Sequence, residues 1–199
     1  NIFSNKQIFE NQNNNLINFK MQQKFPTISL NEDQIALAKW ISSGLNINEV
    51  RNLKGDASYL LNNMIAKFIS SSPTYHLSKK TVISLQANKI NLQKRYKRSR
   101  FYGKSKSPSY VYEHSVPCSL VRKELMKAKK DFESHLKVLI QAGPVVMITR
   151  EEDEKLNSYG LKSVMPQGWE WGYDTFDRYK KAGIEISSKM LLVEGSICR

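Results

Sequence analysis

The feature that most constrains this chain is a stretch of 56 residues, 57–112, that contains no acidic side chain. It holds eleven of the 31 lysine and arginine residues, so its net charge of +11 accounts for most of the +13 carried by all 199 residues. The segments 1–56, 113–149 and 150–199 carry only +1, +2 and −1. Because no carboxylate is available locally, these cations must lie on the surface or face an anionic partner.

Seven cations of this stretch are interleaved with aromatic residues. Polyanions release condensed counterions when lysine and arginine bind their phosphates, and aromatic faces stack on unpaired bases. The pattern therefore predicts a nucleic-acid interface, with DNA as the expected partner and RNA as the alternative. A solvated basic loop or a patch for anionic lipid would have the same composition. The residues assigned to this interface are Lys94, Arg95, Tyr96, Lys97, Arg98, Arg100, Phe101, Lys104 and Lys106.

The rest of the composition is typical of an intracellular protein. No apolar run approaches the roughly 18 residues needed to span a bilayer, and the first residues lack the pattern of a secretory signal. Cys118 and Cys198 are the two cysteines, so neither a disulfide framework nor a CxxC metal site is expected. We expect a cytoplasmic, reducing location and no membrane partner.

The start of the chain is rich in asparagine, with seven in residues 1–20 and little hydrophobic periodicity. Tracts of this kind rarely bury enough apolar surface to fold. We therefore expect residues 1–26 to form a disordered extension. Our hypothesis is that Met21 is the natural first residue.

Residues 27–75 are predicted to form a helical subdomain. Asn31 and Gln34 have the spacing of a capping box, and an apolar stripe follows them. The first two helices, between Ile35 and Leu53, resemble a helix-turn-helix, although three short helices also make a plain bundle. The helices expected here span 31–41, 47–53 and 56–69.

Residues 76–109 are predicted to form a basic arm, and residues 110–199 an α+β part with few strands. The expected fold class is therefore α+β, because strands and helices do not alternate as they do in a doubly wound sheet. Short runs of β-formers indicate the strands, and Thr149 with Glu152 forms a second capping box. The expected strands span 81–85, 110–112 and 145–148, and the expected helices span 119–142, 149–157 and 174–182.

Glu113 and His114 are the residues best suited to catalysis, because they end a strand directly after the basic stretch. A neutral imidazole takes a proton from water near neutral pH. A carboxylate binds Mg²⁺, which polarises a phosphate and stabilises the departing oxygen. A second ligand is available on the helix that follows the strand at 145–148, where Asp153 and Asn157 lie four residues apart on one face.

The segment Tyr112-Glu-His-Ser-Val-Pro117 resembles the acid-His-x-x-Pro start of the HNH (ββα-metal) endonucleases, and residues 145–157 are similar to the second strand and the helix of that motif. The resemblance implies that His114 is the general base and Glu113 a ligand of Mg²⁺ or Mn²⁺. It further implies that Asp153 or Asn157 is the ligand from the helix. The chain departs from the family by about thirty residues, including a helix, between the two halves of the motif.

The other histidines and the aromatic segment are expected to be structural. His76 is expected in a loop, and His135 lies within the helix expected at 119–142. The segment Gln167-Gly-Trp-Glu-Trp-Gly-Tyr173 suggests base stacking, but a surface loop anchored in the core by two indoles has the same pattern.

Three functions fit these observations. The first is a metal-dependent endonuclease that hydrolyses DNA, with His114 as its base. The second is a non-catalytic nucleic-acid-binding protein, such as a regulator that uses residues 35–53. The third is a protein that presents its basic face to an acidic partner. The sequence leaves open whether the protein is an enzyme.

Overall fold

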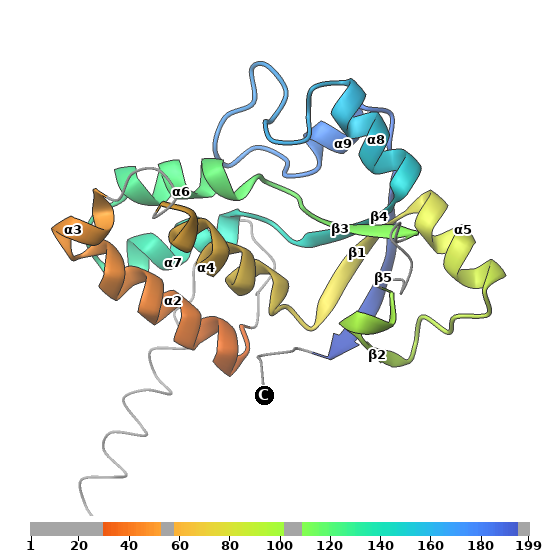
Figure 1. The fold of residues 1–199 in the computed structure, drawn as a ribbon, viewed down its shortest axis with the longest axis horizontal. Coiled ribbons are helices and arrows are strands. Elements are labelled where there is room, and N and C mark those ends of the chain that lie inside the picture. Colours follow the sequence, from red (N-terminus) through yellow and green to blue (C-terminus); the bar gives the residue numbers. More distant parts are fainter. Residues whose placement is uncertain (1–29, 53–57, 102–108, 195–199) are drawn as a thin grey trace, which may run out of the picture.

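The structure is a computed structural model that describes residues 30–52, 58–101 and 109–194, and it has the α+β class predicted from the sequence (Figure 1). One sheet of five strands has the order β2-β5-β1-β4-β3. The pairs β1–β4 and β2–β5 are parallel, whereas β1–β5 and β3–β4 are antiparallel. The strands are β1 (Thr74–Ser78), β2 (Arg95–Lys97), β3 (Tyr110–His114), β4 (Val145–Thr149) and β5 (Ile186–Glu194).

The apolar strand β4, which the sequence predicts correctly, lies between β1 and β3 in the sheet. Its first four side chains, Val145 to Ile148, are all buried. A strand covered on both faces needs such a continuous apolar run. Different helices cover the two faces of the sheet.

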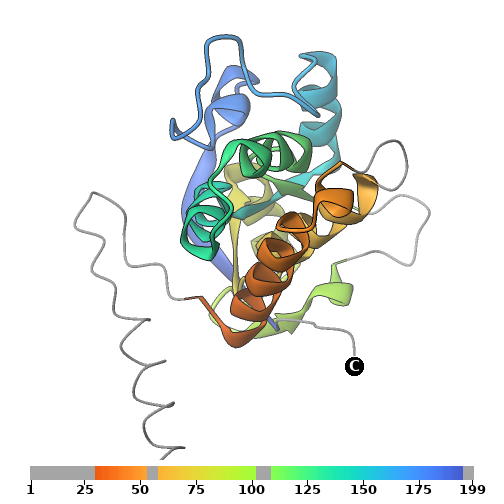
Figure 2. The same ribbon diagram turned by 90° about the vertical axis from the view of Figure 1, so that its left-hand side faces the viewer.

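Four helices cover one face of the sheet (Figure 2). They share one hydrophobic core to which Ile41, Ile65, Leu125 and Leu139 each contribute from a different helix. Residues of the segments 27–75 and 110–199 are therefore buried together. The helices are α2 (Glu32–Leu45), α4 (Ser58–Ser70), α6 (Cys118–Lys127) and α7 (Phe132–Gln141), and the short α3 (Asn48–Arg51) follows α2.

Helices α8 (Arg150–Ser158) and α9 (Asp177–Lys181) lie on the other face, at the top of Figure 1. A second core of Val146, Ile148, Leu156 and Tyr179 joins them to the sheet. None of the helices in the described part of the chain is long and apolar enough to cross a membrane.

Both predicted capping boxes are confirmed. The backbone N–H of Gln34 donates to Asn31 Oδ1 at 2.8 Å at the start of α2. At the start of α8 the N–H of Thr149 donates to Glu152 Oε2 at 2.9 Å. Each side chain satisfies a backbone donor that has no partner within the helix.

The strand predicted at 81–85 is wrong, because these residues belong to helix α5 (Lys79–Ala87). Ser78 caps the helix by accepting from the N–H of Thr81 at 3.0 Å. Val82 and Leu85 are buried while Ile83 is 67% exposed, which is helical rather than alternating periodicity. The β-branched residues of this segment favour a strand locally, and the cap with the tertiary packing outweighs that preference.

The single helix predicted at 119–142 is also wrong, because it divides into α6 and α7. Asp131 begins α7, and its Oδ1 accepts from the N–H of Ser134 at 2.7 Å. The division lets two short antiparallel helices pack on α2 and α4. Strands β1, β2 and β5 are absent from the sequence-based prediction, and His76, expected in a loop, lies in β1.

Candidate functional site

The predicted basic interface lies at one edge of the sheet, in β2 and the following 3₁₀ turn η2 (Arg98–Arg100), at the lower right of Figure 1. Within the described residues strand β2 pairs with β5 alone, and no strand of this part of the chain lies on its other edge. Side chains alternate along a strand. Arg95 and Lys97 are accordingly exposed, and Tyr96 between them is half-buried.

The exposed cations of β2, of η2 and of the segment between α5 and β2 have no carboxylate partner among the described residues. Lysine and arginine in this state retain their full charge toward solvent and toward an anionic ligand. We call this set the basic edge, and it consists of Lys89, Lys94, Arg95, Lys97 and Arg100.

Aromatic rings pack against residues of the basic edge. The guanidinium of Arg100 lies 4.9 Å from the ring centroid of Tyr96, within the range of a cation–π contact. Tyr96 in turn packs edge-on against Phe101 with centroids 5.6 Å apart. Phe101 is only 6% exposed and belongs to the core. Lys104 and Lys106, also assigned to the interface, lie outside the described residues.

Arg98 is placed differently from its neighbours. It is half-buried, its guanidinium lies 5.5 Å from the ring centroid of Tyr75, and its carbonyl accepts from the hydroxyl of Tyr112 at 3.1 Å. These contacts hold the 3₁₀ turn against β1 and β3. Arg98 therefore fixes the turn that presents Arg100.

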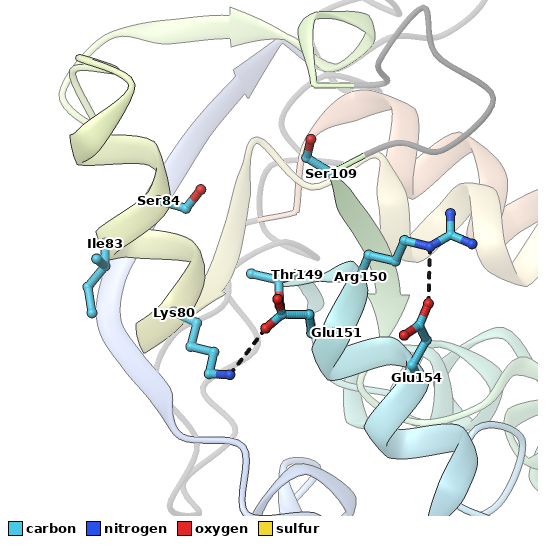
Figure 3. A pocket seen from close by; sticks show the side chains of 8 residues that line it. All are labelled: Lys80, Ile83, Ser84, Ser109, Thr149, Arg150, Glu151 and Glu154. Atoms are coloured by element: carbon cyan, nitrogen blue, oxygen red, sulfur yellow. Dashed lines mark hydrogen bonds and ion pairs between the residues drawn. The ribbon is translucent and has the colours of Figure 1, made fainter.

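A hollow of about 520 Å³ lies between α5 and α8 (Figure 3). Its cations are already paired with neighbouring carboxylates. Lys80 Nζ lies 3.4 Å from Glu151 Oε2, and Arg150 Nε lies 3.2 Å from Glu154 Oε1. The hollow is close to neutral and does not present the charge that a polyanion requires.

Glu113, the predicted metal ligand, is paired with a buried arginine. Arg178 of α9 is 1% exposed and donates to Glu113 Oε2 at 2.7 Å. It also donates to the carbonyls of His114, Leu161 and Lys162 at 2.6, 3.1 and 2.8 Å. We call these groups the Arg178 cluster. They connect the end of β3 to the segment after α8 and to α9.

Burial raises the pKa of Glu113 above its usual range, and the nearby carboxylate of Asp153 adds to the rise. The guanidinium of Arg178 acts in the opposite direction and keeps a counter-charge beside the carboxylate. A perturbed carboxyl in a cleft indicates either a functional site or a structural ion pair. The number of acceptors around Arg178 fits an ion pair that stabilises the fold.

His114, the predicted general base, faces the opposite side of β3. Its Nδ1 lies 3.6 Å from Cys118 Sγ on α6, and its ring also hydrogen-bonds the backbone of Ala66 on α4. Burial is the main cause that lowers the pKa of His114 to about 4. Consecutive residues of a strand point to opposite faces, so the carboxylate of Glu113 and the imidazole of His114 contact different helical layers.

Asp153 and Asn157, the predicted ligands from α8, differ in their environment. Asp153 Oδ2 accepts from Lys162 Nζ at 3.1 Å, while its buried Oδ1 has no hydrogen-bond partner among the described residues. Asn157 lies one turn later and is exposed. No group of three metal-ligating His, Cys, Asp or Glu side chains occurs in the described ranges, and the ββα-metal motif is not confirmed.

The remaining histidines have structural contacts. His76 packs its ring against Phe176 with centroids 5.3 Å apart, and burial lowers its pKa. His135 is buried in α7, where its Nδ1 lies 2.9 Å from Ser42 Oγ of α2. These contacts link parts of the chain that are distant in sequence.

Arg178 is the residue of this region that sequence reasoning did not identify. Its neighbours Lys180 and Lys181 are exposed, so composition gives no reason to separate Arg178 from them. Only the position of α9 against β3 distinguishes it.

Comparisons of the chain with protein-family models, with curated proteins and with solved structures found no match.

Proposed function

We propose that this protein binds nucleic acid through the basic edge. The observation that carries the proposal is a set of five exposed cations, in the edge strand β2, in η2 and in the segment between α5 and β2, without carboxylate partners among the described residues. A nucleic-acid strand offers one phosphate to each of several cations, whereas a single small anion cannot contact them all. Each phosphate contact releases condensed counterions, so the affinity is expected to depend steeply on salt.

The test measures binding of a fluorescent 20-nucleotide DNA, single-stranded and double-stranded, over a range of salt concentrations. In the first variant Arg95, Lys97 and Arg100 are changed to Gln. We expect its dissociation constant to rise at least about tenfold and the log–log salt slope to fall by about 2 to 3.

A matched control removes the same charge from cations that already have a carboxylate partner. Lys79, Lys80 and Arg150 are paired with Glu185, Glu151 and Glu154, and their change to Gln should raise the dissociation constant less than about threefold. Equal losses in both triple variants would attribute the binding to net charge alone and would contradict the proposal. Binding to anionic lipid vesicles but to neither DNA would identify the edge as a membrane contact.

A second candidate is metal-dependent hydrolysis of the bound strand, as the resemblance to HNH endonucleases implies. It is favoured by the buried Oδ1 of Asp153, which has no hydrogen-bond partner among the described residues, and by the repulsion between this carboxylate and that of Glu113, which raises the pKa of Glu113. These two carboxylates would hold Mg²⁺ or Mn²⁺, which would polarise a phosphate. Arg178 would then orient Glu113, and the neutral imidazole of His114 would accept a proton only if it reached the face of β3 on which Glu113 lies.

Plasmid nicking in Mg²⁺, Mn²⁺ or EDTA tests this candidate. We expect metal-dependent nicking by the wild type and its loss in Glu113→Gln and Asp153→Asn. Loss in His114→Ala at an unchanged melting temperature would support the general-base role. No nicking by the wild type with either ion would contradict hydrolysis and leave the binding function untouched.

A further inference from the structure

A second hollow, of about 310 Å³, lies between the turn that joins α6 to α7 and the aromatic segment near Trp171. Helices α6 and α7 are at the opposite end of the molecule from β2 (Figure 1). Three lysines and one carboxylate line it, together with polar and apolar groups. The lining residues used in the argument are Glu124, Lys127, Lys129, Lys137, Gln141 and Trp171.

Two of the three lysines have no carboxylate partner in the described part of the chain. Lys127 pairs with Glu124 at 3.0 Å, whereas Lys129 and Lys137 are exposed and unpaired. Two such ammonium groups around one small hollow suit a phosphate, because each offers three donors and a full charge.

Trp171 supplies an aromatic group held in one orientation. Its indole N–H donates to Gln141 Oε1 at 2.9 Å, and the ring of Trp169 packs edge-on against it with centroids 6.0 Å apart. It is half-buried, so part of the side chain stays accessible. A fixed ring loses little entropy when a base stacks on it.

We propose that this hollow binds one unpaired nucleotide, with the base on Trp171 and the phosphate between Lys129 and Lys137. The inference rests on the proposed function and deepens it, because it names a single-stranded segment as the ligand. Duplex DNA keeps its bases stacked within the helix and offers no free face to an indole.

The test follows tryptophan fluorescence in a Trp40→Phe background, since Trp40 on α2 is 55% exposed and would respond independently. The probe is a 5′-phosphorylated thymidine trinucleotide, which is too short to reach the basic edge at the same time. We expect saturable quenching, and a dissociation constant raised at least about fivefold in Lys129→Gln/Lys137→Gln. The matched control is Lys123→Gln/Lys181→Gln, which removes two exposed cations that have no ion pair among the described residues and do not line the hollow.

The outcomes separate this site from the basic edge. The triple variant of Arg95, Lys97 and Arg100 is expected to bind the 20-nucleotide DNA more weakly. If the trinucleotide still quenches the fluorescence of this variant, the hollow is a second contact. No quenching, or an equal loss of trinucleotide affinity in both double variants, would contradict nucleotide binding in the hollow. Either result would leave the proposed function intact. Equal affinity for single-stranded and duplex 20-nucleotide DNA, with no effect of Trp171→Leu, would also contradict nucleotide binding in the hollow. Failure of the wild type to bind either long DNA would instead contradict the proposed function.

Discussion

The basic edge and the Arg178 cluster place the same kind of charge in opposite environments. Arg178 is 1% exposed and donates to a carboxylate, three carbonyls and the hydroxyl of Tyr179. The cations of the basic edge are exposed, and none has a carboxylate partner among the described residues.

The difference in burial and in hydrogen-bond partners separates the charges that stabilise the fold from those that are available to a partner. A buried guanidinium must find acceptors for its donors, because desolvation without partners costs several kcal/mol. An exposed one is solvated by water and can exchange that water for phosphate at little cost. Net charge treats both alike, and only the geometry separates them.

The largest effect is expected from removing the buried arginine. Arg178→Met should lower the free energy of unfolding by about 3 to 5 kcal/mol, because it leaves Glu113 buried without its counter-charge. Urea unfolding measures the difference. Lys181→Met, on the same helix and exposed, is the control and should change stability by less than about 0.5 kcal/mol. If the two variants were equally stable, the Arg178 cluster would not hold the fold together.

A smaller effect is expected from the pH dependence of His114. Its pKa is lowered to about 4 in the folded protein, whereas an unfolded histidine titrates near 6.5. Between these values the unfolded chain binds a proton that the folded chain does not, so stability falls as the pH falls from about 6.5 to 4 and is unaffected above 6.5.

The comparison of wild type with His114→Gln isolates this contribution, since all carboxylates are common to both. From pH 7 to pH 4.5 the wild type should lose about 2 to 3 kcal/mol more than the variant. Chemical unfolding at a series of pH values measures it. Parallel stability curves would mean that the imidazole stays solvated in the folded protein.

The local signals in the sequence predicted several elements well. The capping boxes at Asn31 and Thr149 form as predicted, and the apolar run of β4 forms a buried inner strand of the sheet. These signals succeed because a cap needs only residues three positions apart, and a strand covered on both faces needs apolar residues throughout.

The elements that sequence reasoning missed depend on distant contacts. Strand β2 has three residues and exists because β5 pairs with it at 192–194, nearly a hundred positions later. Side chains alternate along a strand, so adjacent Glu113 and His114 point to opposite faces of β3, but the helices that cover each face depend on contacts distant in sequence. That adjacency predicted one shared site, whereas the helices on each face bring different partners to the two side chains.

The smallest effect is expected at an ion pair that is exposed like the basic edge but has a carboxylate partner like Arg178. Lys80 and Glu151 lie 3.4 Å apart, with side chains 63% and 80% exposed. Such pairs gain little in water, because solvent screens the attraction and both side chains lose freedom. Lys80→Gln, Glu151→Gln and the double variant should therefore give a coupling energy below about 0.5 kcal/mol in urea unfolding, falling further in high salt. A coupling above about 1.5 kcal/mol would place this pair with the Arg178 cluster instead, and the hollow between α5 and α8 would then be a structural junction of the fold.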